Sequence, residues 1–431
     1  MMFFDKFLRA NVLRLVVSTS LLFGISSLQA VQDSTATAKK SDYTSKSNFE
    51  KVIDLPGEII FLPFRLIFGA TSSGIAVVYD NHLLPRIASA LTSDDGKRGL
   101  RPIYSSRSGF GLKFFWKDFI TPGGRLTPKA SIGLLRRQAY ELSAKRITIL
   151  NGNLVIGASA GYYNMPDESF FGVGINAPEE DRANYAREMA AFELNLGPNF
   201  TPRLKTDLTF GYEINNILPG RSSTRDQLGE VFDLTTLSGV ETGVKLGRAA
   251  ISLEYNGTNS LGNPSSGFLA SFHTGLYSQM GDEEQYGFTR TGVDLSQHFN
   301  LFKERTLVLR LAAEDVAARD DKEIPFYYLS EIGSQETVRG FPRGRFHDED
   351  MLLGSAEYRF PLRNRTTKES ISALFFVDAG KVTPDLYDSF NADNLEVTYG
   401  LGFRVWKQSG LLTKFEVGFS SDGFRLILSI D

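Results

Sequence analysis

The histidines are the first residues to test for chemistry, because the chain of 431 residues has no cysteine and only four histidines. They are His82, His273, His298 and His347, and none stands in a His-Glu-x-x-His or Cys/His ligand spacing. His273 and His298 lie in strand-like segments, so a lipid hydrolase built on one of them is an alternative to a polar structural role. The pattern predicts no enzyme, no metal site and no cofactor.

A second candidate for a functional site is the segment SQETVRGFPRGRF, residues 334–346, in which glycine and proline separate Arg339, Arg343 and Arg345. This punctuation fits neither a helix nor a strand, and it predicts a loop. The formal net charge of the chain is −3, which gives no reason to expect nucleic acid as a partner. Arg343 and Arg345 are expected to be ordinary charges of a loop or a lumen.

Two carboxylates follow this loop on segments that alternate like strands. In LLGSAEYRF, Glu357 and Arg359 fall on the face opposite to the neighbouring aromatic residues. In ALFFVDAG, Phe376 and Asp378 share one face. A guanidinium that lies among carboxylates with little access to solvent can form a bidentate, charge-assisted pair. An arginine of the loop therefore has suitable partners on these two segments, unless the loop is simply solvated.

A sheet must position these side chains, and from about residue 107 onward the chain alternates with a period of two. In KFEVGFS, for example, Phe415, Val417 and Phe419 share one face. A soluble sandwich or barrel would turn this apolar face inward. A membrane barrel turns it outward and keeps charge and glycine in the lumen. Arg, Lys and Glu mix with small residues on the opposite faces, so the pattern favours an all-β, transmembrane antiparallel β-barrel.

The number of strands depends on how two long stretches are divided. Counting 235–246 and 248–256 as separate strands, and starting at 108–117, gives sixteen, which we expect. In that count the long segments 165–184 and 215–234 fall on the side where the short turns of a membrane barrel belong. Merging 127–149 and 235–256 into single strands gives fourteen and repairs the alternation of long and short connections, so fourteen stays possible.

The N-terminal region differs from the barrel region. Lys6, Arg9 and Arg14 surround the start of an apolar run, and Ala30 is a plausible cleavage position, which is typical of a signal peptide. A membrane anchor is the alternative. The sequence predicts four parts: a signal peptide 1–30, a polar linker 31–47, a short amphipathic helical segment 48–105 in the periplasm and a barrel 106–431.

Three motifs follow one another in the last hundred residues. They are Val338-Arg339-Gly340-Phe341, then Gly354 with Glu357-Tyr358-Arg359-Phe360-Pro361, then Phe376, Asp378 and Gly380. In this order and spacing they resemble the C-terminal barrel of the BamA/TamA family of bacterial outer-membrane proteins, the bacterial surface antigen barrel that is related to two-partner-secretion transporters. The chain departs from that family in two ways. Residues 31–105 are expected to hold no POTRA domain, and the last residue is Asp431 instead of an aromatic residue.

The resemblance implies a site inside the barrel. The loop of about residues 316–349 would enter the lumen, where Arg339 would pair with Asp378 and Glu357. Gly340 would allow a sharp turn at the tip, next to Phe341. The supporting motif residues would be Val338, Gly354, Arg359, Phe376 and Gly380.

The resemblance also implies a monomeric barrel in the bacterial outer membrane, in contact with its lipid. The implied activity is insertion or translocation of polypeptide, or of lipid, through a weak seam between the first and last strands. Unfolded outer-membrane or secreted polypeptides would be its clients. A passive pore or a structural barrel plugged by its own loop is the alternative from another class.

Overall fold

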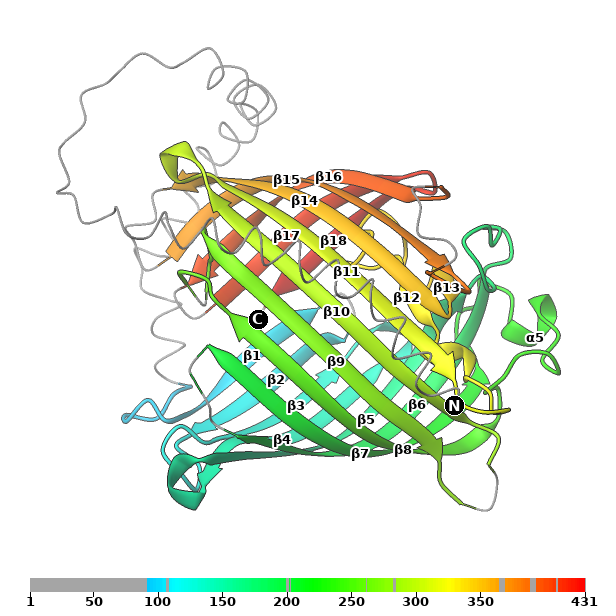
Figure 1. The fold of residues 1–431 in the computed structure, drawn as a ribbon, viewed down its shortest axis with the longest axis horizontal. Helices are drawn as coiled ribbons and strands as arrows, with labels where there is room; N and C mark the ends of the chain where they lie inside the picture. Colours follow the sequence, from blue (N-terminus) through cyan, green and yellow to red (C-terminus); the bar gives the residue numbers. More distant parts are fainter. Residues whose placement is uncertain are drawn as a thin grey trace, which may run out of the picture. The chain divides into compact units, whose positions relative to one another are not determined.

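The computed structural model describes residues 91–431, except 106–107, 199–200, 202, 261, 282–283, 364–368, 388–392, 408–409 and 431. Sixteen antiparallel strands form one sheet that closes into a barrel (Figure 1). The expected signal peptide, linker and most of the expected amphipathic segment lie outside the described residues. No helix in the described part of the chain is long and apolar enough to cross a membrane.

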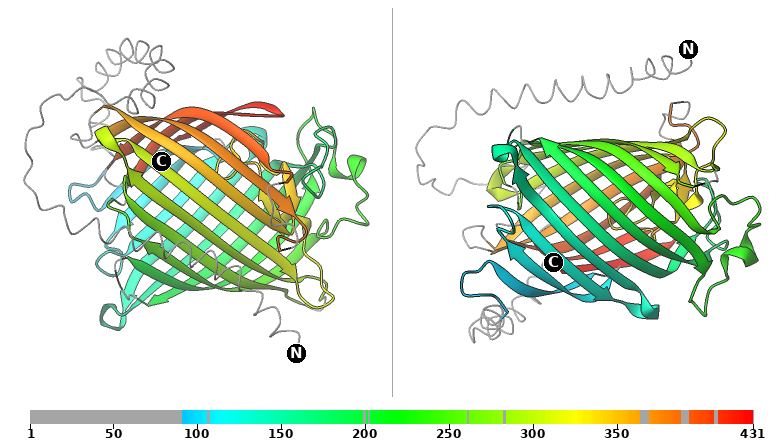
Figure 2. Two further views of the ribbon diagram at one scale, coloured as in Figure 1. Left: turned by 45° about the horizontal axis from the view of Figure 1, so that its top comes forward. Right: turned by 90° about the horizontal axis from the view of Figure 1, so that it is seen from below.

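The strands follow one another around the barrel in chain order, and all are tilted against its axis (Figures 1 and 2). The first eight are β1 (Arg98–Ser105), β2 (Gly109–Lys117), β3 (Arg125–Ile132), β4 (Gln138–Ile149), β5 (Leu154–Phe170), β6 (Ala183–Pro198), β7 (Leu204–Pro219) and β8 (Thr242–Asn256). The others are β9 (Gly267–Gln279), β10 (Gly287–Asn300), β11 (Thr306–Ala318), β14 (Asp350–Arg363), β15 (Glu369–Thr383), β16 (Glu396–Lys407), β17 (Gly410–Ser420) and β18 (Gly423–Ile430).

The long connection between β11 and β14, residues 319–349, carries its own short sheet. Its strands are β12 (Ser330–Ile332) and β13 (Phe346–Asp348). A short helix, α5 (Leu228–Val231), lies in the connection between β7 and β8. In Figure 1 these elements lie at the same end of the barrel. In outer-membrane barrels the end with the long connections is extracellular and the end with the short turns is periplasmic.

The outer face of the barrel is apolar, as the alternation predicts for a membrane barrel. On β18, Phe424 and Leu426 are 69% and 58% exposed, whereas Ile427 between the outward positions is buried. The pairing register continues this face around the barrel, because Phe419 lies opposite both Phe424 and Tyr399. A continuous belt of exposed apolar side chains is the surface that a bilayer covers. The soluble alternative is therefore excluded.

The expected count of sixteen strands is confirmed. Two errors in the expected strands offset each other, because one strand was missed and another was divided into two. Residues 98–105 form β1, so the barrel starts inside the range 48–105 that was expected to be an N-terminal segment. Residues 235–246 and 248–256 are not two strands, because β8 runs without a break from Thr242 to Asn256. With these corrections the four longest connections, β5–β6, β7–β8, β11–β14 and β15–β16, fall at one end, and the alternative of fourteen strands is wrong.

The seam between the first and last strands is the shortest junction of the barrel. β1 and β18 share two residue pairs, Tyr104 with Ile430 and Ser105 with Ser429. In contrast, β1 shares eight pairs with β2, and β17 shares eight with β18. Since β1 ends opposite Ser429, the preceding residues of β18, 423–428, extend beyond the end of β1. Most of both seam edges therefore has no ladder partner among the described strands.

Candidate functional site

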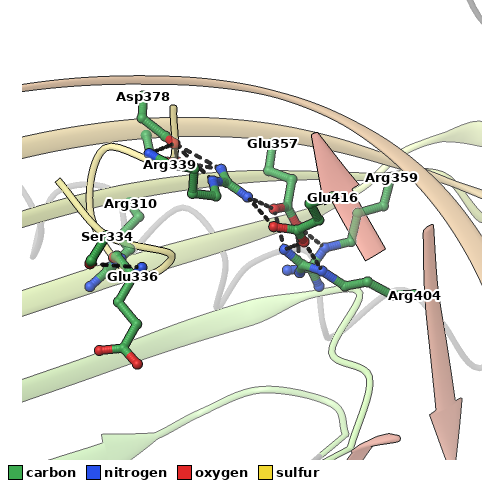
Figure 3. A network of polar contacts seen from close by, with 10 residues as sticks. Arg310, Ser334, Glu336, Arg339, Glu357, Arg359, Asp378, Arg404 and Glu416 are labelled. Carbon is green, nitrogen blue, oxygen red and sulfur yellow. Dashed lines mark hydrogen bonds and ion pairs between the residues drawn. The ribbon is translucent and has the colours of Figure 1, made fainter. Parts of the chain in front are cut away.

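Arg339 lies at the tip of the β11–β14 connection and is only 6% exposed, inside the barrel. Its Nε and Nη2 atoms donate to the two carboxylate oxygens of Asp378 on β15, at 2.8 and 2.7 Å. Its Nη1 atom donates to Glu357 on β14 at 2.9 Å. Figure 3 shows the guanidinium directed at both carboxylates. The structure thus brings together the arginine and the two carboxylates that the sequence suggested.

The guanidinium of Arg339 also lies over an aromatic ring. Its Cζ atom is 3.6 Å from the ring centroid of Phe376, which shares the inner face of β15 with Asp378. This cation–π contact explains why the motif carries an aromatic residue two positions before the aspartate. Burial alone would lower the pKa of Arg339, but the hydrogen bond and charge of Asp378, with Glu357 and Glu416, raise it above its ordinary value. The guanidinium therefore stays charged in the lumen.

The pair belongs to a larger network in which Arg339, Arg359 and Arg404 meet Asp378, Glu357 and Glu416 (Figure 3). Arg404 on β16 donates to both oxygens of Glu357 at 2.9 and 2.8 Å and to Glu416 on β17 at 2.7 Å. Arg359 also donates to Glu357. The formal charges cancel, which offsets much of the cost of burying them. Sequence analysis missed Arg404 and Glu416, although both fall on the polar faces of strands that it recognised.

Gly340 is needed for a different reason from the one expected. Its backbone is not in the left-handed region, so no sharp turn requires a glycine. Instead, a Cβ atom at this position would lie 2.7 Å from the carbonyl oxygen of Phe419 and 2.8 Å from Cγ2 of Thr398. The loop tip is pressed against the inner wall formed by β16 and β17. Gly418 on β17 allows the same close contact from the barrel wall, because a Cβ at Gly418 would lie 3.0 Å from the carbonyl oxygen of Arg339.

The apolar motif residues pack around the tip. Val338 and Phe341 are fully buried in one cluster with Leu353 of β14. Gly380 leaves room for this packing, because a Cβ at Gly380 would lie 3.0 Å from Cγ2 of Val338. Gly354 has no comparable close contact, since the nearest atom to a Cβ there is 3.9 Å away. Arg339 with its two carboxylate partners is called the anchor below. Of the five supporting motif residues, Phe376 contacts Arg339, Arg359 bonds Glu357, and Val338 and Gly380 pack together at the loop tip.

Arg345 is a second buried arginine of the loop, which the sequence analysis treated as an ordinary charge. It is as buried as Arg339, at 6% exposure. Its Nε atom donates to Asp422 in the β17–β18 turn at 2.6 Å, and its Nη1 atom donates to the carbonyl oxygen of Ala177 at 2.7 Å. Arg343, in contrast, is partly exposed and pairs with Glu331 at 2.9 Å. The expectation is wrong for Arg345 and holds for Arg343.

The histidines of the described ranges lie on three different strands, His273 on β9, His298 on β10 and His347 on β13. His273 faces the lumen, with Nε2 3.6 Å from Glu314, and His298 is buried on β10. The segment 157–161, Gly-Ala-Ser-Ala-Gly, has the spacing of a nucleophile elbow, but Ser159 lies in the regular ladder of β5. His82 is outside the described residues. Within the described ranges no group of three His, Asp or Glu side chains could hold a metal ion.

Comparison with known proteins places this barrel in a family. The model of the Omp85 superfamily domain matches residues 124–420, more than half of the chain. Among solved structures, BamA from Haemophilus ducreyi lacking POTRA domains 1–3 aligns with a TM-score of 0.56 at 16% identity, over 77% of this chain and 69% of that one. CdiB from Escherichia coli aligns with a TM-score of 0.50 at 12% identity, over 77% of this chain and 62% of that one. Curated protein sequences give no match.

These identities are too low to carry more than the fold, and the chain spans less than two thirds of the length of CdiB. The family match rests on the sequence of residues 124–420 and agrees with the resemblance of the three motifs to the BamA/TamA family. Omp85 barrels are, broadly, transporters and insertases of the outer membrane rather than enzymes. The apolar outer belt, the sixteen-stranded barrel and the family match together show that this chain is a bacterial outer-membrane protein of the Omp85 superfamily.

Proposed function

We propose that this barrel assists the insertion or translocation of polypeptide, or of lipid, at the outer membrane through its β1–β18 seam. The observation that carries the proposal is the seam itself, which has two residue pairs where the neighbouring junctions have eight. Unpaired strand edges present backbone N–H and C=O groups that can template an incoming strand. Opening such a seam breaks few hydrogen bonds, so it costs less than opening any other junction.

The loop has a defined part in this proposal. Arg339, Gly340 and Phe341 fix its tip on the wall of β14 to β17, through Asp378 and Glu357. That wall then stays rigid while the strands at the seam separate. The partners of the barrel would be outer-membrane lipid and unfolded polypeptide clients, with the barrel itself acting as a monomer and without nucleic acid or a cofactor.

A disulfide across the seam tests the proposal directly, because the native chain has no cysteine. Ser105→Cys with Ser429→Cys joins directly opposed residues of β1 and β18. We expect liposomes that contain the barrel to accelerate insertion of an unfolded barrel substrate over protein-free liposomes. The oxidised seam pair should remove this acceleration, and a reductant should restore it.

The matched control is Ser131→Cys with Ala139→Cys, which joins β3 to β4 away from the seam. Its oxidation should leave the acceleration unchanged. If the wild-type barrel gives no acceleration, the insertase proposal fails.

The alternative is a passive or structural barrel plugged by its own loop. The loop does bury Ile332, Val338 and Phe341 completely inside the barrel, which favours a plug. A plug predicts that Arg339→Ala raises conductance in planar bilayers while the wild-type barrel does not accelerate insertion.

A further inference from the structure

Two arginines at the extracellular end of the barrel converge on one neutral hydroxyl group. Arg182 directly precedes β6, at the end of the β5–β6 connection, and Arg225 lies in the β7–β8 connection. The Nε and Nη2 atoms of Arg182 both donate to Oγ of Ser169 on β5 at 3.3 Å, and Nη1 of Arg225 donates to the same oxygen at 3.4 Å. Two guanidinium groups are therefore held beside a single oxygen that carries no charge.

A third arginine, Arg425 on β18, reaches the same region from the barrel wall. Its Nη1 atom donates to a carbonyl oxygen of the β11–β14 loop at 2.7 Å. Burial lowers the pKa of Arg182, and so do the positive charges of Arg225 and Arg425. Two carboxylates, Glu179 and Asp167, raise the same pKa, but the net shift is downward. The surroundings of Arg182 therefore disfavour its positive charge.

Other arginines at this end of the barrel form ion pairs with carboxylates. These pairs are Arg137 with Asp167 and Glu168, Arg343 with Glu331, and Arg345 with Asp422. The side-chain hydrogen bonds of Arg182, Arg225 and Arg425 go to uncharged oxygens instead. Among the residues that the structure describes, no carboxylate forms an ion pair with these three arginines. We call them the arginine triad.

The arginine triad is held in place rather than spread over the surface. The Cζ atom of Arg182 lies 5.4 Å from the ring centroid of Phe171, whose side chain is buried. All three arginines of the triad are half-buried, so solvent and salt screen their mutual repulsion only in part. Like charges that are fixed in this way cost stability unless an anion offsets them.

We propose that Arg182, Arg225 and Arg425 form a binding site for a phosphate group at the extracellular end of the barrel. Guanidinium groups bind phosphate oxygens through charge-assisted and often bidentate hydrogen bonds. A phosphate monoester carries three terminal oxygens and a charge of about −1.5 to −2, so it can accept hydrogen bonds from three arginines. A carboxylate has only two oxygens and one charge. The Ser169 hydroxyl can donate a further hydrogen bond to the phosphate.

Two sources can present a phosphate group at this end of the barrel, a phosphorylated lipid of the outer leaflet and a soluble phosphate compound. Calorimetric titration of the full-length barrel in dodecyl maltoside separates them. The probes are inorganic phosphate, dihexanoyl phosphatidic acid, which is a lipid phosphomonoester, and zwitterionic dihexanoyl phosphatidylcholine. We expect inorganic phosphate and phosphatidic acid to compete for one site, without competition from phosphatidylcholine. Tighter binding of phosphatidic acid than of inorganic phosphate assigns the site to lipid, and equal or weaker binding assigns it to a soluble compound.

The test variant is Arg182→Gln/Arg225→Gln, which should weaken phosphate binding at least about tenfold, because it removes two charged donors. The matched control is Arg136→Gln/Arg221→Gln, which removes two exposed arginines from connections at the same end. This control should change the affinity by less than about twofold, because solvent screens exposed charges. A second variant, Ser169→Asp, places a carboxylate between the two guanidinium groups and should abolish phosphate binding, whereas Ser169→Asn should retain it.

Four results overturn the proposal. The first is that neither inorganic phosphate nor phosphatidic acid binds the wild-type barrel. The second is an equal loss of affinity in the two double variants, which indicates general electrostatic attraction. The third is unchanged phosphate binding by Ser169→Asp. The fourth is a tri-glutamate peptide that displaces phosphate and binds more tightly, which assigns the arginine triad to an acidic polypeptide.

Two features keep these results distinct from other effects. Heat-dependent mobility of each variant in detergent gels verifies that the barrel has formed, so lost binding is not confused with lost folding. The site is also independent of the proposed function, because the residue pairs of the β1–β18 seam do not include Arg182, Arg225 or Arg425. Phosphate binding without accelerated insertion would therefore refute only the insertase function.

Discussion

At the level of single residues, Arg339 joins two strands of the barrel wall to the loop. Its guanidinium bonds Asp378 on β15 and Glu357 on β14, and it rests on the ring of Phe376. A lysine cannot reproduce this geometry, because an ammonium lacks the planar fork that binds a carboxylate bidentately. Arg343, four residues further along the loop, shows that charge alone does not define the anchor, because its side chain is partly exposed.

We predict that Arg339→Ala destabilises the barrel by about 3–5 kcal/mol, because it leaves buried carboxylates without their cation. Arg339→Lys should lie between wild type and Arg339→Ala. Arg343→Ala, the control, should change stability by less than about 1 kcal/mol, because its pair with Glu331 is partly exposed. The measurement is the urea midpoint of the refolded barrel in detergent. Equal midpoints for Arg339→Ala and Arg343→Ala would contradict the anchor.

At the level of elements, the β11–β14 loop makes several side-chain hydrogen bonds to the last hairpin, β17–β18, whereas β1 pairs with only two residues of β18. Arg345 bonds Asp422 in the hairpin turn, and the Arg425 side chain donates to the carbonyl oxygen of Phe341 at 2.7 Å. The Ser420 hydroxyl donates to the carbonyl oxygen of Gly340 at 3.1 Å. Contacts inside the lumen therefore position the seam strand β18. The edge of β18 that faces β1 has only two paired residues.

A double-mutant cycle on Arg345 and Asp422 tests this second contact. We predict a coupling of about 1–3 kcal/mol between Arg345→Ala and Asp422→Ala, because the two side chains are buried and hydrogen-bonded. The same cycle on Arg343 and Glu331 should give no more than about 1 kcal/mol. Additive effects at Arg345 and Asp422 would show that the pair does not hold the hairpin.

At the level of the whole molecule, the barrel combines a rigid wall with a weak seam. The wall of β14 to β17 carries the buried network and the loop tip, whereas β1 and β18 meet over two pairs. A barrel that opens at one junction needs this asymmetry, because the β1–β18 seam must separate while the wall of β14 to β17 stays folded.

Hydrogen exchange should reveal the asymmetry. We predict that the amides of β18 from Gly423 to Leu428 exchange faster, as a group, than the amides of β16, which is paired on both sides. Oxidising the seam disulfide should slow exchange at the β1–β18 junction and leave β16 unchanged. Uniform protection across β16, β17 and β18 would mean that the seam does not open.

Much of this fold could be inferred from the sequence, because its signals are local. The alternation of apolar and polar residues marks a membrane barrel, and on any strand it sets which residues face inward. The resemblance of three spaced motifs to the BamA/TamA family implied that Arg339 pairs with Asp378 and Glu357. Such patterns need no knowledge of which strands are neighbours.

The remaining features depend on register and closure, which only the tertiary structure decides. β1 has too weak an alternation to be recognised, and it becomes a strand because β2 pairs along its whole length. Arg345 is an anchor because the turn at Asp422 comes to lie beside the loop. The sequence of a single strand sets the period of its side chains but not its offset against the neighbouring strand, and that offset determines how short the β1–β18 seam is.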